Sequence, residues 1–164
     1  MSVDLIVKNA KVYTSSGPVQ AGLAVKDEKI VAICDEKYLP AEGKVIDASG
    51  KVVIPGLWFT HCHFRDPGFP QKEDFESGTK CAAAGGISFI IDMPNNDPAP
   101  MHVENFELKK DIARRKAVVD YGLYGGGVEP DNIQGLVEAG AIGIKIFNTR
   151  HVKDAYPYIP SIGI

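Results

Sequence analysis

The sequence predicts an α/β fold in which a parallel β-sheet follows a small β layer. From Pro55 onward, apolar strand-like runs alternate with amphipathic helical segments, which is the rhythm of a parallel α/β sheet. Before that point, short alternating segments are separated by turn-forming residues, which is typical of antiparallel strands. We therefore divide the chain into residues 1–54 and 55–164.

The composition describes a globular chain with neither a nucleic acid nor a membrane as an expected partner. The 164 residues are 45% hydrophobic and 24% charged, which allows a sizeable core. The net charge of -3 is small and mixed in sign. Three cysteines without C-x-x-C spacing indicate free thiols in a reducing compartment. With no leader-like start and no long apolar run, we expect a cytoplasmic protein.

The first 54 residues contain three segments in which apolar and polar residues alternate. They are residues 4–14, 22–33 and 43–54. The stretches "SSGP" and "KDEK" are turn signals between apolar runs. This pattern predicts a small antiparallel β layer.

The remainder is predicted to contain strands and helices in strict alternation. The expected strands are residues 56–64, 86–94, 117–127 and 141–148. The expected helices are residues 72–86, 101–115 and 130–140. Pro100 precedes the second helix, and Gly86 and Gly140 end the first and third as C-terminal caps do. Four strands that alternate with three helices predict a parallel sheet.

One basic cluster, "KKDIARRK" from Lys109 to Lys116, ends the second predicted helix. Cations there complement the helix dipole, so the cluster is interpreted as a solvated surface. A phosphate-binding role is the alternative.

The stretch "THCHFRDPG" places His61 and His63 one residue apart at the end of a buried apolar run. In a strand, such residues point to the same face, so the two imidazoles could bind one metal ion. The alternative is a polar strand end without a ligand. Cys62 points to the opposite face and is interpreted as packed. Arg65 lies in the following loop, where "DPG" signals a turn.

Other polar residues follow or end the later strands. Asp92 and Asn95 follow the second strand, and Lys145 lies in the fourth. The carboxyl ends of parallel strands form one edge, so these groups are expected to converge there with the histidines. Isoleucines flank Lys145, and burial of an unpaired ammonium favours the neutral amine, which could take up carbon dioxide and become an anionic oxygen ligand. A lysine that extends to solvent is the alternative.

Three stretches in this order resemble the amino-terminal half of a dihydroorotase, a cyclic amidohydrolase related to hydantoinases and allantoinases. They are "VVIPGLWFTHCHFRDPG", "KEDFESGTKCAAAGGISFIIDMPNNDPAP" and "AGAIGIKIF". The resemblance implies a (β/α)8 TIM barrel of the metal-dependent hydrolase type, of which residues 55–164 supply the first four β/α units, and a small β-sandwich portion in residues 1–54. It also implies two zinc ions at the barrel mouth and assembly as a homo-oligomer.

The same resemblance implies roles for individual residues. His61 and His63 would ligate one metal, carboxylated Lys145 would bridge both, and Arg65 and Asn95 would hold a substrate carboxylate. The expected reaction is the reversible cyclisation of N-carbamoyl-L-aspartate to dihydroorotate in pyrimidine biosynthesis.

The catalytic residue that the resemblance implies, a general-base aspartate, is expected beyond Ile164. The family's remaining metal-binding histidines are expected there as well, because they belong to the second half of the barrel. No residue of the sequence is therefore assigned as the general base, and the isolated 164-residue chain is expected to be inactive.

Arg65 favours dihydroorotase, because allantoinases usually carry asparagine at the matching place and hydantoin rings lack that carboxylate. A hydantoinase or allantoinase is the alternative enzyme. Arg65 could instead form a loop salt bridge, and Asn95 could be a turn residue. Phe59 replaces the family's usual aspartate, which leaves a catalytically silent scaffold as the third hypothesis.

Overall fold

The computed structural model describes residues 2–146, which form two compact units. The first is Met1–Pro55, and the second begins at Gly56. The last residues of the fourth predicted strand, 147–148, lie outside the described part of the chain.

The first unit is a single mixed β-sheet in the order β3-β2-β1-β4, with β5 also beside β1. Its elements are β1 (Leu5–Thr14), β2 (Gly17–Lys26), β3 (Lys29–Cys34), the short 3-10 helix η1 (Glu36–Tyr38), β4 (Lys44–Asp47) and β5 (Val52–Val53). The first three strands are antiparallel, as predicted. Asp27 and Glu28 join β2 to β3 with φ of 50° and 62°, the positive values that a tight two-residue hairpin needs.

The prediction of a wholly antiparallel layer is wrong for β4 and β5, which run parallel to β1. The reason is the connection after β3. Residues 35–43 include η1 and carry the chain far enough for β4 to enter in the direction of β1, which a tight turn cannot do. The β-sandwich stays a prediction, because the described residues of this unit form one sheet.

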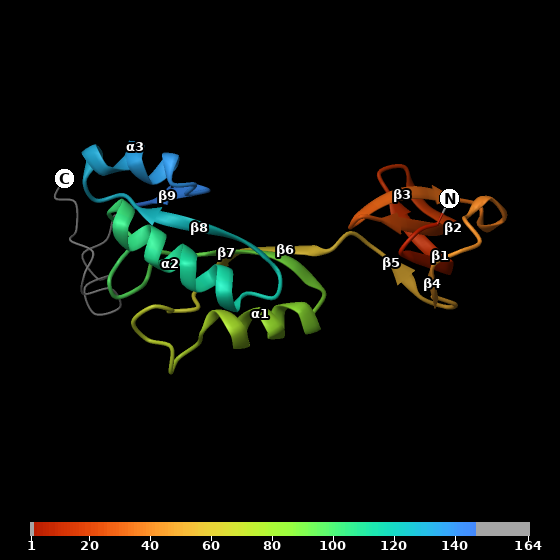
Figure 1. The fold of residues 1–164 in the computed structure, drawn as a ribbon, viewed down its shortest axis with the longest axis horizontal. Coiled ribbons are helices and arrows are strands. Elements are labelled where there is room, and N and C mark those ends of the chain that lie inside the picture. Colours follow the sequence, from red (N-terminus) through yellow and green to blue (C-terminus); the bar gives the residue numbers. More distant parts are fainter. Residues whose placement is uncertain (1, 147–164) are drawn as a thin grey trace. The chain divides into compact units, whose positions relative to one another are not determined.

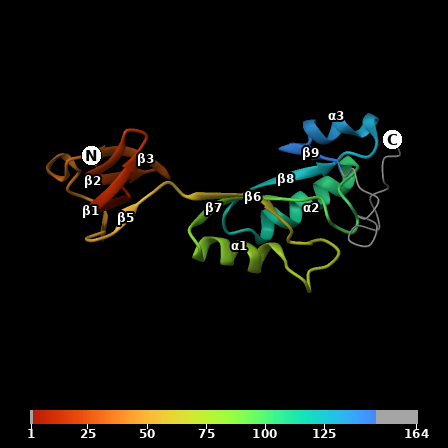
Figure 2. The same ribbon diagram turned by 180° about the vertical axis from the view of Figure 1, so that it is seen from behind.

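The second unit is a curled sheet of four parallel strands in chain order, β6-β7-β8-β9, with one helix between each pair (Figures 1 and 2). The strands are β6 (Leu57–Cys62), β7 (Ile87–Asp92), β8 (Asp120–Gly126) and β9 (Gly143–Lys145). The helices are α1 (Phe75–Ala84), α2 (Val103–Lys116) and α3 (Pro130–Glu138). The predicted α/β alternation is confirmed, and the arrangement is that of part of a barrel.

Local signals explain where the helices begin and end. Asp74 caps α1, since its carboxylate accepts a hydrogen bond from the Ser77 amide at 2.8 Å. Pro130 opens α3 at a position where its missing amide hydrogen is not needed. Gly86 follows α1 with φ of 79°. No helix within residues 2–146 is long and apolar enough to cross a membrane.

The core of this unit lies between the strands and the helices. Its buried members are Cys62, Phe64, Phe75, Ala82, Ile90, Phe106, Ala113, Leu123 and Leu136. Phe75 is fully buried, and its ring meets that of Phe64 edge-on at 5.5 Å. The segment directly after β6 is thereby anchored to α1.

The register of the parallel strands brings their carboxyl ends to one edge of the sheet. Cys62 pairs with Asp92, and Asp92 pairs with Leu123. Lys145 pairs with Gly126, three residues further along β8. The candidate site lies along this edge.

Candidate metal-binding site

His61 and His63 lie side by side, as the alternation predicts. Their ring centroids are 5.1 Å apart, with 58° between the ring planes. His61 is exposed and is the last residue but one of β6, whereas His63 follows the strand and is half-buried. Two imidazoles at this separation present nitrogen ligands to a shared space at the edge of the sheet.

The environment of His63 favours its neutral form. Burial lowers the pKa of His63, and the nearby positive charge of Arg65 acts in the same direction. The neighbouring Asn95 side chain and the charge of Asp92 oppose this shift without reversing it. The neutral imidazole is the form that binds a metal ion.

Cys62 turns away from the two histidines. Its thiol lies 3.3 Å from the carbonyl oxygen of Ile91, and the residue is 4% exposed. Burial raises the pKa of the Cys62 thiol far above the usual cysteine range, so the thiol stays protonated. Cys62 is therefore a packed residue, as interpreted from the sequence.

Lys145 and Asn95 lie on the same edge of the sheet at different distances from the histidines. Asn95 is 3% exposed, and its side chain acts on the pKa of His63, which places Asn95 beside that imidazole. Lys145 is half-buried at the end of β9, and β7 and β8 lie between it and the histidine strand. Three strand spacings correspond to roughly 14 Å measured along the sheet, a gap that curling shortens.

The loop that carries Arg65 is attached to the loop that carries Asn95. The carbonyl of Pro67 accepts hydrogen bonds from the Asn96 side chain at 3.2 Å and from the Asp97 amide at 3.3 Å. Gly68 has φ of 106°, and a Cβ there would sit 2.6 Å from the Asp97 nitrogen. Arg65 and Asn95 thus lie on two loops that hold each other in place.

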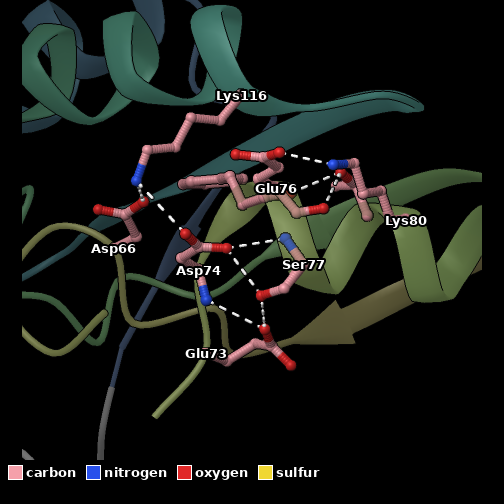
Figure 3. Close-up of polar contacts among 9 residues, drawn as sticks. Asp66, Glu73, Asp74, Glu76, Ser77, Lys80 and Lys116 are labelled. Carbon is pink, nitrogen blue, oxygen red and sulfur yellow. Dashed lines mark hydrogen bonds and ion pairs between the residues drawn. The ribbon is translucent and has the colours of Figure 1, made fainter. Parts of the chain in front are cut away.

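A network of charged residues holds the first of these loops against the helices (Figure 3). Lys116, at the end of α2, reaches Asp66 at 2.7 Å and Asp74 at 3.6 Å. Asp74 also accepts from the Ser77 hydroxyl at 2.7 Å. Asp66 is buried, so the lysine neutralises a carboxylate that solvent hardly reaches.

The prediction of a solvated basic cluster is wrong for Lys109, the first residue of that cluster. Its side chain is fully buried, and its ammonium lies 2.8 Å from the Asp92 carboxylate. The physical reason is its position on α2, because Phe106 and Ala113 lie three residues before and four residues after it and are buried on the same face. That spacing was the signal in the sequence that identifies Lys109 as an inward-facing residue.

The described residues supply some, but not all, of the ligands that a metal ion needs. Two adjacent imidazoles, one of them favoured in its neutral form, suit Zn²⁺ or a similar divalent ion. Within residues 2–146, no group of three or more His, Cys, Asp and Glu side chains is arranged to hold a metal. Two imidazoles alone do not fill the four positions of a zinc site, so the role of Lys145 as a further ligand stays a prediction.

The general base that the family resemblance implies was expected beyond Ile164. Residues 147–164, with Ile164 as the last of them, lie outside the described part of the chain. The general-base aspartate and the further metal-binding histidines therefore stay predictions. The described residues supply candidate groups for metal and substrate binding, and none of them is assigned as the base.

The chain is similar to several known proteins in sequence and in fold. The Dihydro-orotase-like family pattern matches residues 50–147. An allantoinase of Desulfitobacterium hafniense is 40% identical over 94% of the chain, and a dihydroorotase of Methanosarcina mazei is 35% identical over 88%. The chain covers 35% and 31% of these two relatives, so it spans about a third of their length.

The similar solved structures include L-hydantoinase from Arthrobacter aurescens, with a TM-score of 0.84 and 37% identity. This likeness covers 90% of the chain and 33% of that structure. D-Hydantoinase from Thermus sp. has a TM-score of 0.76 and 27% identity over 88% of the chain and 33% of that structure. The described sheet and helices therefore recur within larger proteins.

Proposed function

Because the chain belongs to the dihydro-orotase-like family of cyclic amidohydrolases, we propose that it contributes to a metal-dependent enzyme that hydrolyses or closes cyclic amides. We propose dihydroorotase as the activity, the reversible cyclisation of N-carbamoyl-L-aspartate. Residues 55–164 would form the first four β/α units of a TIM barrel, and residues 1–54 part of a β-sandwich. The chain spans about a third of its curated relatives, so the activity is proposed for the whole protein.

In this proposal the residues at the sheet edge hold two divalent ions, most simply zinc. His61 and His63 would bind one ion through neutral imidazoles, and carboxylated Lys145 would bridge the two. When bound, such metals activate water and polarise an amide carbonyl. The neutral state of His63 and the adjacency of its ring to that of His61 support this assignment.

The position of Arg65 beside the proposed metal ligands is the observation that supports dihydroorotase over the other activities. Its positive charge acts on His63, which places a guanidinium close to the proposed metal ligands. Dihydroorotate and carbamoyl-aspartate both carry a carboxylate that is not consumed in ring closure, and a guanidinium pairs with a carboxylate through two parallel hydrogen bonds. Asn95, on the attached loop, would donate to the same carboxylate.

An allantoinase or hydantoinase is the second candidate function. It is favoured by the 40% identity to the Desulfitobacterium allantoinase and by the likeness to the Arthrobacter hydantoinase. Allantoin and hydantoin rings lack the carboxylate that Arg65 would bind. The two proposals therefore differ in the part played by one side chain.

The test compares two arginine-to-lysine substitutions in the purified whole protein. Arg65→Lys keeps the charge and removes the planar fork, whereas Arg115→Lys makes the same change at an exposed position of α2. We expect Arg65→Lys to lower kcat/KM for carbamoyl-aspartate roughly 10- to 100-fold, the cost of about 1.4 to 2.8 kcal/mol of lost pairing. Arg115→Lys should leave it unchanged.

One result would contradict the role of Arg65, and two would contradict dihydroorotase. If Arg65→Lys and Arg115→Lys have the same kcat/KM for carbamoyl-aspartate, Arg65 does not bind the substrate carboxylate. Turnover of allantoin or hydantoin but not of carbamoyl-aspartate would establish the second candidate. A purified whole protein that neither binds zinc nor acts on any of these substrates would be the silent scaffold that Phe59 suggested.

A further inference from the structure

Two buried charges next to the histidine segment, residues 61–64, have no part in the proposed reaction. Lys109 on α2 and Asp92 at the end of β7 both have side chains that are 0% exposed. The Lys109 ammonium lies 2.8 Å from Asp92 Oδ2 and donates to the carbonyl of Met93 at 2.8 Å. Since removing two charges from water is costly, a buried ion pair is weak evidence of a purely stabilising role.

The second carboxylate oxygen of Asp92 forms a hydrogen bond with the histidine segment. Asp92 Oδ1 accepts a hydrogen bond from the Phe64 amide at 2.8 Å, and the Cys62 thiol lies 3.8 Å from the same oxygen. The carbonyl of Cys62 also accepts from the Met93 amide at 2.9 Å. The residues on both sides of His63 are therefore held by the end of β7.

We propose that Asp92 and Lys109 are positioning residues that fix the backbone of the histidine segment and so the direction of its imidazoles. This inference rests on the proposed metal site. Lys109 orients the Asp92 carboxylate from α2, and that carboxylate then holds the Phe64 amide through a charge-assisted hydrogen bond in a water-excluded interior.

The contacts of the pair exclude a direct catalytic role for its lysine. Lys109 Nζ is fully buried and directed at Asp92 and Met93, so a substrate at the sheet edge does not reach it. The neighbouring lysine of the same helix has a different environment. Lys110 bonds to Glu107 on its own helix and to the Ala139 carbonyl, with 42% of its side chain exposed. Of these two lysines, only Lys109 contacts residues at the end of β7.

The test uses an uncharged double variant, Asp92→Leu with Lys109→Met, in which the Phe64 amide loses its acceptor. Removal of both charges avoids the stranded buried carboxylate that Lys109→Met alone would leave, which protects the fold. The matched control is Leu136→Ala, which opens a cavity at a fully buried core position on α3 and removes neither a charge nor a hydrogen bond of the histidine segment. Each protein is titrated with zinc against a chelating dye, and the visible spectrum of bound cobalt(II) is recorded.

We expect zinc to bind the double variant about 10- to 100-fold more weakly than the wild type, the range seen when partners of metal ligands are removed. The cobalt spectrum should change, and the Phe64 amide should exchange its hydrogen faster. Leu136→Ala should leave zinc affinity and the cobalt spectrum as in the wild type. Wild-type affinity and an unchanged spectrum in the double variant would overturn the proposal, as would an equal loss in Leu136→Ala.

The outcome also separates this inference from the proposed function. If the wild type binds no zinc, the proposed function fails, and hydrogen exchange at Phe64 decides the positioning role. Faster exchange in the double variant than in Leu136→Ala would support it. The same exchange rate in both variants would refute it.

Discussion

Replacement of Lys116 by methionine is expected to destabilise the second unit and loosen the loop that carries Arg65. Lys116 contributes the cation that lies 2.7 Å from Asp66 and 3.6 Å from Asp74. The Asp66 side chain is only 7% exposed, so the substitution removes the counter-ion of a nearly buried carboxylate. Methionine keeps most of the length of the lysine side chain, so the change tests the charge rather than the packing.

The size of the effect follows from the exposure of the two partners. An exposed ion pair contributes about 0–1 kcal/mol, and breaking a fully buried pair from one side costs about 3–5 kcal/mol. The Lys116 side chain is 36% exposed, so water screens the pair, and we expect a loss of about 1–3 kcal/mol in the free energy of unfolding. The hydrogen bond with Asp66 raises the pKa of Lys116, so this contribution is fully present at neutral pH and is lost only as pH rises through the lysine range.

Urea unfolding of the variant and of a matched control measures the loss. Lys80→Met removes the exposed pair with Glu76, whose side chains are 60% and 55% exposed, and should cost less than about 0.5 kcal/mol. With a slope of about 2 kcal/mol per molar urea, a loss of 2 kcal/mol lowers the midpoint by about 1 M. A midpoint for Lys116→Met equal to that for Lys80→Met would refute the reasoning.

Four further changes test other parts of the structure. His61→Ala combined with His63→Ala should abolish binding of zinc at the proposed site, and metal analysis with unchanged stoichiometry would contradict this. Phe75→Ala should lower the free energy of unfolding by about 3–5 kcal/mol, because the ring is fully buried, as measured by urea unfolding. The Ser77 amide lowers the pKa of Asp74, so the stability from this carboxylate is present above about pH 4–5 and is lost as pH falls below about 4. Asp74→Asn should therefore be less stable than the wild type at pH 7, and thermal unfolding should show the difference narrowing at pH 3. ¹³C-labelled bicarbonate should give a carbamate resonance in the metal-loaded protein that is absent in Lys145→Met, and its absence from the wild type would contradict carboxylation.

The order of elements in the second unit could be predicted from the sequence because each carries its own signal. Asp74, Pro130 and Gly86 mark helix ends through local backbone chemistry, and the apolar runs mark strands. The direction of β4 could not be predicted in this way. It depends on the path of residues 35–43 across the sheet, and no residue of β4 itself encodes that path.

The candidate site was predictable where neighbours in sequence create it. Alternation alone brings His61 beside His63, and a turn signal places Arg65 in the next loop. The burial of Lys109 was not predicted, because its charge favoured an exposed position although its spacing from Phe106 places both residues on the same face of α2. The buried carboxylate that accommodates it belongs to a different element, and that pairing becomes visible only when the helix packs on the sheet.

The contacts around the histidine segment have a consequence for synthesis of the chain. Phe64 bonds to Asp92 across 28 positions, and Lys109 bonds to Met93 across 16. Chains fold from the amino terminus as they leave the ribosome. Asp92, Met93 and Lys109 have been translated once α2 is complete, so their contacts with the histidine segment can form before β8 and β9 have been made.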